Sequence, residues 1–144
     1  MAETTAKQGD HPIKFTITHY RLPQHTHEAF IKWITDEHLP LAMPVLKRHG
    51  VLGYSLFVTP APLNDGLRAL YKELRPTWDV ADHDCVIEYL LPDMQCIQKI
   101  MSDPDWQTAV QDQDQWVDVP RALVTLGHHI PFLLETGEVV NMSK

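Results

Sequence analysis

Four stretches of the chain carry the alternation of apolar and polar residues, or the short apolar runs, that predict β-strands. The first, over 13–22, places Phe15, Ile17 and His19 on one face and lysine and threonine side chains on the other. A period of two with β-branched residues is typical of a half-buried strand. Further strands are predicted at 51–58, 84–91 and 121–129.

Helices are predicted between the first two strands, and a proline interrupts them. Thr26 is placed to cap the first helix, and Trp33 lies on its apolar face. A proline inside a helix removes a hydrogen bond and crowds the preceding turn. Pro40 therefore predicts a break near His38 and a second short helix that runs to residue 48 and stops at Gly50.

Two segments follow the second strand. The connection over 60–82 has helix-forming composition at 65–74, and connections of this length are often functional. After the third strand, Asp93 is placed to cap a helix that Asp103-Pro104 ends, and one more turn is predicted at 106–110. The apolar stripe that we expect this helix to bury consists of Met94, Ile97, Ile100 and Met101.

The order strand, helix, strand occurs twice, which predicts an α+β protein with a ferredoxin-like β-α-β-β-α-β fold. Such a fold has a four-stranded antiparallel sheet with helices on one face only. An apolar sheet face must be covered, and face-to-face pairing in a homodimer would cover it and enclose a cavity. We expect a flexible arm over 1–11, a folded domain over 12–130 and a tail over 131–144.

The composition and net charge of the chain argue against several classes of protein. The chain of 144 residues is 44% hydrophobic and 22% charged, as expected for one globular domain. A net charge of −7 argues against nucleic-acid binding. The sequence shows no apolar run long enough to span a bilayer and no secretory signal, so we expect a cytoplasmic protein without a membrane partner. Cys85 and Cys96 are expected to be free thiols in the core.

Nine histidines are the unusual feature, because histidine titrates near neutral pH. His38 lies at the predicted helix break, where the backbone can aim its ring into a cavity or let it cap the helix. His19 shares an apolar strand face that points either at the helices or into the dimer barrel. His83 lies between Asp82 and Asp84, and a neighbouring carboxylate can orient an imidazole for general acid chemistry. We expect these three histidines to be catalytic.

Five further residues are candidates for substrate binding: Tyr54, Trp78, Asp84, Glu88 and His128. A strand tyrosine can donate to a phenolate or enolate, and a tryptophan in a connection can line a flat aromatic pocket. Glu88 lies in an apolar strand, where a carboxyl group is either paired or has a raised pKa. Of the adjacent His128 and His129, at most one can face a cavity. No metal site is predicted, since the closely spaced His25 and His27 lack a third ligand nearby.

Several motifs of the sequence resemble those of a known protein family. The segment from Ile13, with Trp33 and then His38-Leu39-Pro40-Leu41, resembles the opening of EthD-domain proteins. The later sequence resembles the fungal polyketide branch of that family, through an ordered series that consists of Asp84, Glu88, Pro92-Asp93, Asp103-Pro104, Trp116, Asp118 and Gly127. The resemblance covers about residues 13–130.

The resemblance implies a dimeric α/β barrel that acts on small molecules without a bound cofactor. The activity it implies is that of a lyase, a decarboxylase of an anthraquinone-type aromatic polyketide carboxylic acid such as atrochrysone carboxylic acid. We hypothesise that His38 and His83 would handle the proton, with His19 and Tyr54 as oxyanion donors. The alternatives are a polyketide cyclase or dehydratase, a cofactor-free anthrone monooxygenase, and a non-catalytic dimer that binds a hydrophobic small molecule.

Overall fold

A computed structural model describes residues 11–143 as an antiparallel sheet with a layer of helices packed on one face and one further helix that projects on the other side. The four strands are β1 (Ile13–His19), β2 (Gly53–Val58), β3 (Cys85–Leu91) and β4 (Leu123–His128), in the order β2-β3-β1-β4. This is the ferredoxin-like order, so the predicted α+β class and four-stranded antiparallel sheet are confirmed. β2 begins two residues later than predicted, and β4 begins after a short 3₁₀ turn, η4 (Val119–Arg121). The predicted N-terminal arm lies outside the described residues, except for His11.

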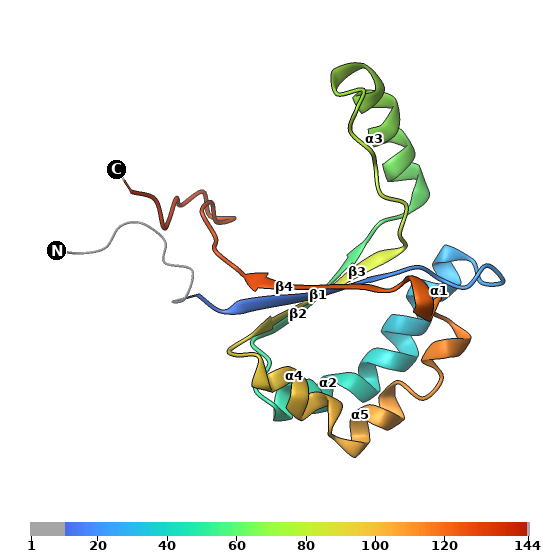
Figure 1. Cartoon of the computed structure of the whole chain (residues 1–144), viewed down its shortest axis with the longest axis vertical. Helices are drawn as coiled ribbons and strands as arrows, with labels where there is room; N and C mark the ends of the chain where they lie inside the picture. Colours follow the sequence, from blue (N-terminus) through green and yellow to red (C-terminus); the bar gives the residue numbers. More distant parts are fainter. Residues whose placement is uncertain (1–10, 144) are drawn as a thin grey trace.

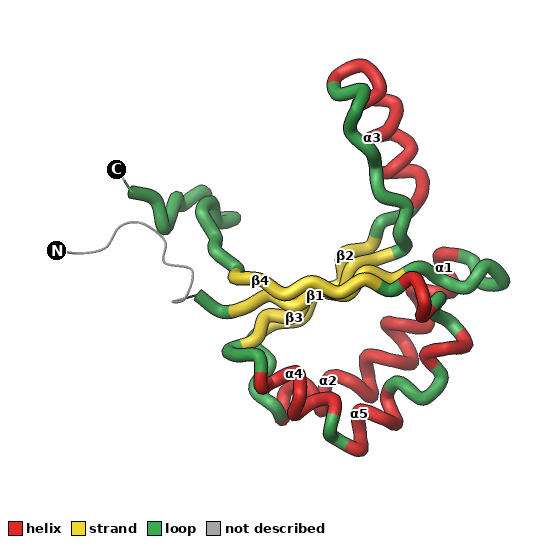
Figure 2. Tube along the Cα trace, in the orientation of Figure 1, coloured by secondary structure: helices red, strands yellow, loops and turns green. Residues whose placement is uncertain are grey.

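The helices divide between the two sides of the sheet (Figure 1). On one side lie α1 (His27–Trp33), the π-helical turn η2 (Ile34–His38), α2 (Leu39–Arg48), α4 (Gln95–Met101) and α5 (Pro104–Ala109), followed by the 3₁₀ turn η3 (Gln113–Gln115). On the other side α3 (Ala61–Leu74) stands away from the sheet, and its chain returns to β3 as an extended loop (Figures 1 and 2). The helix predicted at 65–74 is therefore present and four residues longer at its start.

Register fixes which side chains face the helices. Ile17 of β1 lies opposite Ile87 of β3 and Val124 of β4. Because side chains alternate along a strand, Phe15, Ile17 and His19 face the helices, which selects the first of the two orientations that the sequence left open for His19. The opposite side of the sheet, which we call the bare face, carries Lys14, Thr16, Thr18, Ser55, Phe57, Val86, Glu88, Leu90, Leu123 and Thr125.

The prediction of a helix break near His38 is wrong, because the chain remains helical there and only the type of helical turn changes. The Leu39 backbone N–H donates to the Ile34 carbonyl, five residues back, and closes a π-helical turn. Pro40 follows in the first turn of α2, where a missing N–H is tolerated but the ring crowds the preceding turn. The wider turn accommodates that crowding, and it places His38 on the buried side of the helix.

The interior contains two packed clusters. One joins α2, α4 and α5 to β3 through residues such as Leu46, Leu91 and Trp106, and the other surrounds Phe30 and Trp33 of α1. Large hydrophobic side chains at full burial, such as Phe30, contribute about 3–5 kcal/mol each when measured by truncation to alanine. These two clusters therefore fix the helices against the sheet.

Helix α4 corrects one prediction. Of the expected buried stripe, Ile100 is buried and Ile97 is half-buried, but Met94 and Met101 are exposed. The helix begins only at Gln95, so Met94 precedes its periodicity, although the Asp93 carboxylate does accept the Cys96 N–H as a cap would. Cys96 takes the buried position instead. Both cysteines are buried free thiols, and burial raises the pKa of Cys85 to about 12.

None of the helices within residues 11–143 is long and apolar enough to span a bilayer.

Candidate active site

A cavity of about 380 Å³ lies within the chain, between the sheet and the helices that cover it. This volume is within the range of about 300–1,000 Å³ that is typical of small-molecule sites. Strands β1, β3 and β4 form one wall, and α4, α5 and the segments that follow them form the other. The lining residues are Phe15, Ile17, His19, His38, Ile87, Tyr89, Leu91, Ile97, Ile100, Met101, Trp106, Gln107, Val110, Gln113, Ala122 and Val124.

His38 reaches this cavity from the end of the π-helical turn. Its side chain is 8% exposed, and Nδ1 lies 3.0 Å from the carbonyl oxygen of Ala109 at the end of α5. A carbonyl can only accept, so the hydrogen-bond network assigns the proton to Nδ1. Nε2 of the neutral ring is therefore a lone-pair acceptor, as a general base requires.

His38 is also held between aromatic rings. Trp33 stacks on it at 5.6 Å between ring centroids and 25° between planes, and Trp106 meets it edge-on at 5.9 Å. Burial lowers the pKa of His38, while the Ala109 carbonyl and the charge of Asp112 oppose that shift. Asp112 also accepts a hydrogen bond from Trp33 Nε1 at 3.4 Å. The ring is thus fixed in orientation and neutral at pH 7.

His19 lines the same cavity from the end of β1 and is 7% exposed. Burial, reinforced by the nearby His38, lowers the pKa of His19 to about 4. Its Nδ1 is buried and has no hydrogen-bond partner within residues 11–143. A proton on Nδ1 would therefore have no acceptor, so the N–H of the neutral ring is assigned to Nε2. A neutral imidazole with a free N–H can polarise a carbonyl oxygen.

The cavity contains no fixed charge. Among the described residues that line it, none is aspartate, glutamate, lysine or arginine, and the side chains with polar groups are His19, His38, Tyr89, Trp106, Gln107 and Gln113. Because both histidines are neutral, a carboxylate ligand would enter without a cationic partner. Burial of an unpaired carboxylate is costly, so the cavity suits a neutral, largely apolar ligand.

His83 and Asp84 lie in a different place from His38. Together with Arg21, His27 and Arg68 they line a small polar pocket of about 120 Å³ where α3 leaves the sheet. The Thr59 hydroxyl donates to the His83 carbonyl at 2.6 Å, so the neighbouring His83 Nδ1, at 3.0 Å, must donate to that hydroxyl. The structure therefore does not bring His83 and His38 into one site.

Asp84 is the hub of that polar pocket. Its side chain is 5% exposed, and its carboxylate accepts from the Arg21 backbone N–H at 2.8 Å, the Arg21 guanidinium at 2.6 Å and His27 Nδ1 at 2.9 Å. Burial by itself would raise the pKa of Asp84, but these donors lower it below its ordinary value. The arrangement ties β1, α1 and β3 together at one end of the sheet.

The remaining predicted binding residues are dispersed. Tyr54 of β2 meets Tyr89 edge-on at 5.1 Å between centroids but does not line the cavity, and burial raises the pKa of its hydroxyl. Glu88 lies on the bare face, 3.7 Å from Lys14 Nζ. His128 is exposed at the end of β4, and Trp78 is exposed on the loop that returns from α3.

Some cavity residues were not singled out from the sequence. Tyr89 alternates with Ile87 and Leu91, so the strand period alone would have placed it on their face. Trp106 and Asp112 have no such local signal, because they reach His38 only through the packing of α5 and the turn after it. No group of three residues that could hold a metal ion occurs within residues 11–143.

The sequence matches one known protein family over most of its length. The model of the EthD domain family matches residues 22–120. The protein named Dehydratase iacD from Pestalotiopsis fici is 29% identical over 132 residues, which cover 92% of this chain and 95% of that protein. The conidial pigment biosynthesis dehydratase EthD of Metarhizium robertsii is 24% identical over 142 residues, 97% of each chain.

Solved structures share the fold at much lower identity. SnoaB of Streptomyces nogalater, described as a cofactor-independent oxygenase, matches with a TM-score of 0.55 and 10% identity, over 86% of this chain and 98% of that one. At such identity the likeness shows the fold alone.

Proposed function

The chain belongs to the EthD domain family, and on that premise we propose that it is a dehydratase that removes water from a neutral, cyclic β-hydroxy ketone of polyketide type. One observation carries the proposal: two buried, neutral histidines face one apolar cavity that has no charged lining residue among those described. The names of the two dehydratase relatives support it. They favour this reading over the decarboxylation that the sequence resemblance implied.

In this mechanism His38 moves the proton. Its Nε2 accepts the proton from the carbon next to the ketone, and the electron pair of that C–H bond forms an enolate. The enolate then forms the C=C bond as the C–O bond to the hydroxyl breaks. Protonated His38 returns the proton to the leaving hydroxyl, which departs as water, so the atoms and the charge balance.

His19 stabilises the charge that develops on the ketone oxygen. Because Nδ1 of His19 has no hydrogen-bond partner, the proton of the neutral ring is assigned to Nε2. A fixed hydrogen-bond donor in a cavity without water stabilises a developing negative charge more than the same donor does in water. A neutral donor also avoids the second positive charge that would oppose protonation of His38. His19 and His38 therefore have separate roles in one site, while the sequence-based hypothesis had paired His38 with His83.

Decarboxylation would require a different cavity. A substrate carboxylate would lie among apolar side chains and two neutral imidazoles, with no lysine or arginine within the described lining. The cost of burying an unpaired carboxylate reaches several kcal/mol. The same argument favours dehydration over any reaction whose substrate is a carboxylic acid anion.

The experiment uses two substrates that differ by one carboxyl group. Purified protein is incubated with a neutral cyclic β-hydroxy ketone and, separately, with the matching ring carboxylic acid, and products are identified by mass. We expect loss of one water from the neutral compound, and binding of the acid that is at least about tenfold weaker. Loss of CO₂ from the acid, with the neutral compound unchanged, would overturn the proposal and restore the decarboxylase hypothesis.

The pH dependence follows from the pKa of His38. A base must be deprotonated, and burial lowers this pKa, so kcat/KM should be level near pH 7–8 and fall on the acid side with a midpoint below about 6.5. Asp112→Asn removes a negative charge that raises the pKa, so the midpoint should move to still lower pH. A midpoint above about 6.5, or one that Asp112→Asn leaves in place, would contradict the assignment of His38 as the base.

A further inference from the structure

The buried polar side chains of the cavity lie at two places along the strands. His19 and His38 share one end, since the proximity of His38 helps to lower the pKa of His19, and Trp106 meets the His38 ring edge-on. Tyr89 lies farther along the sheet, because it pairs with Phe15, four residues before His19 in β1. At about 3.3 Å per residue, this register separates Tyr89 from His19 by about 13 Å along the strands.

Packing explains the ring of Tyr89 but not its hydroxyl. The ring contacts Phe15 at 5.6 Å and Tyr54 at 5.1 Å between centroids, and a phenylalanine could make both contacts. The side chain is 4% exposed and lines the cavity. Within residues 11–143 its hydroxyl forms no hydrogen bond, and burial is the cause that raises its pKa. Since buried polar groups are almost always paired, an unpaired hydroxyl that lines a cavity indicates a partner in the ligand.

Tyr54 provides a direct comparison on the neighbouring strand. It lies opposite Tyr89 in the pairing of β2 with β3, and its hydroxyl is buried without a hydrogen-bond partner within the described chain. Tyr54 does not line the cavity. A ligand in the cavity can therefore reach the hydroxyl of Tyr89 but not that of Tyr54.

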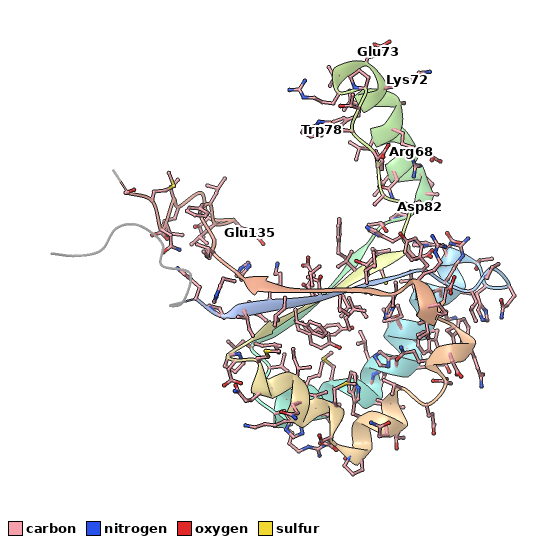
Figure 3. The ribbon with its side chains drawn as sticks, in the orientation of Figure 1. Arg68, Lys72, Glu73, Trp78, Asp82 and Glu135 are labelled. Atoms are coloured by element: carbon pink, nitrogen blue, oxygen red, sulfur yellow. The ribbon has the colours of Figure 1, made fainter. Side chains whose placement is uncertain are left out.

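Charged side chains do not supply the missing partner. None of the described residues that line the cavity is charged. Figure 3 shows its labelled charged side chains on the other side of the sheet, and these are Arg68, Lys72, Glu73, Asp82 and Glu135. Of the lining glutamines, Gln113 is half-buried, and the exposed Gln107 donates from Nε2 to the Met101 carbonyl at 3.0 Å. Within the described chain, the Tyr89 hydroxyl is therefore available to a ligand.

The volume of the cavity limits the size of that ligand. An apolar cavity of about 150 Å³ holds one benzene ring. The cavity of about 380 Å³ has roughly two and a half times that volume. Two fused six-membered rings therefore fit, with room for their oxygen substituents.

We propose that Tyr89 is a specificity-determining residue whose hydroxyl forms a hydrogen bond with an oxygen on the far ring of a neutral, bicyclic ketone. The ketone oxygen lies at His19 in the proposed function, on which this assignment rests. Side chains on one face of a sheet stand roughly perpendicular to it, so their polar atoms are separated about as their backbones are. Hydrogen bonds of about 2.8–2.9 Å at both ends of a span of about 13 Å leave about 7 Å between two ligand oxygens. A hydroxyl on the second ring, across from the ketone, matches that separation.

The test measures binding by calorimetry, with the whole chain and two probes. One probe is 1-tetralone, a bicyclic ketone, and the other is 6-hydroxy-1-tetralone, which adds only the distant hydroxyl. We expect the natural sequence to bind the hydroxylated ketone about three- to tenfold more tightly. Tyr89→Phe should abolish this difference and leave the Kd for 1-tetralone within about twofold. Tyr54→Phe is the matched control, because it removes the same group from the neighbouring strand, and it should keep the difference.

Neither probe carries a hydroxyl that can leave as water from beside the ketone, so the result does not depend on whether the chain is a dehydratase. His19→Phe should weaken both probes by a similar factor, because both present the same ketone. Both tyrosine variants retain the aromatic ring, and circular dichroism checks that they are folded. The assignment of Tyr89 would be overturned if neither ketone binds, if the natural sequence shows no preference for the hydroxylated ketone, if that preference survives Tyr89→Phe, or if Tyr54→Phe removes it as well.

Discussion

Replacing His38 by asparagine is expected to lower kcat/KM for dehydration by about 100- to 10,000-fold. Asparagine retains an amide N–H close to the position of Nδ1, so the hydrogen bond to the Ala109 carbonyl can persist. What the substitution removes is Nε2, the atom that we propose accepts and returns the proton. The measurement is the initial rate of product formation from the neutral β-hydroxy ketone.

Two further histidine-to-asparagine substitutions test whether the loss of activity is specific to His38. His129→Asn makes the same change at a histidine outside the cavity lining and should leave kcat/KM within about twofold. His83→Asn tests the pairing suggested by the sequence. A loss at His83 as large as at His38 would place proton transfer in the polar pocket beside α3 and refute the cavity mechanism.

Asp84→Asn is expected to lower the free energy of unfolding by about 3 kcal/mol, as measured by urea denaturation. The new amide would turn its NH₂ group toward the donors of Arg21 or His27, so at least one buried hydrogen bond would be lost together with the ion pair. Asp82→Asn is the matched control, since Asp82 is exposed two residues earlier, and its effect should stay within about 0.5 kcal/mol.

The effect of Asp84→Asn should also depend on pH. The pKa of Asp84 is lower in the folded state than in the unfolded chain, so its contribution is complete above the unfolded pKa. That contribution is lost as the pH falls through the folded pKa. The difference between the natural protein and the variant should therefore narrow toward about pH 3. A difference that grows on acidification would show that the Arg21 and His27 donors do not hold this carboxylate.

Local sequence patterns predicted much of the fold, because side-chain orientation repeats every two residues in a strand and about every 3.6 residues in a helix. The alternation of Phe15, Ile17 and His19 placed His19 on an apolar face, and register then turned that face toward the helices. Thr26 caps α1 as expected, through a hydrogen bond from the Ala29 N–H. These are properties of neighbouring residues, so a single sequence contains them.

The composition of the site was harder to predict, because it depends on contacts between distant segments. Ala109 and Asp112 lie more than seventy residues from His38, and only the packing of α5 brings them together. His83 and Asp84 appeared to belong with His38 because carboxylates flank His83 in the sequence. In the structure Asp84 turns toward Arg21 and His27 instead, and the polar pocket forms a separate center beside α3.

The π-helical turn before His38 has a consequence for how this site can be gained or lost. The turn contains one residue more than an α-helical turn would need, and each residue of an α-helix rotates the following side chains by about 100°. Deletion of one residue between positions 34 and 37 would make the helix a regular α-helix. Either the His38 imidazole would then turn away from the cavity, or α2 would rotate relative to α1. The position of the proposed base therefore depends on one extra residue in the helix, and a one-residue deletion there should displace His38 while leaving the sheet unchanged.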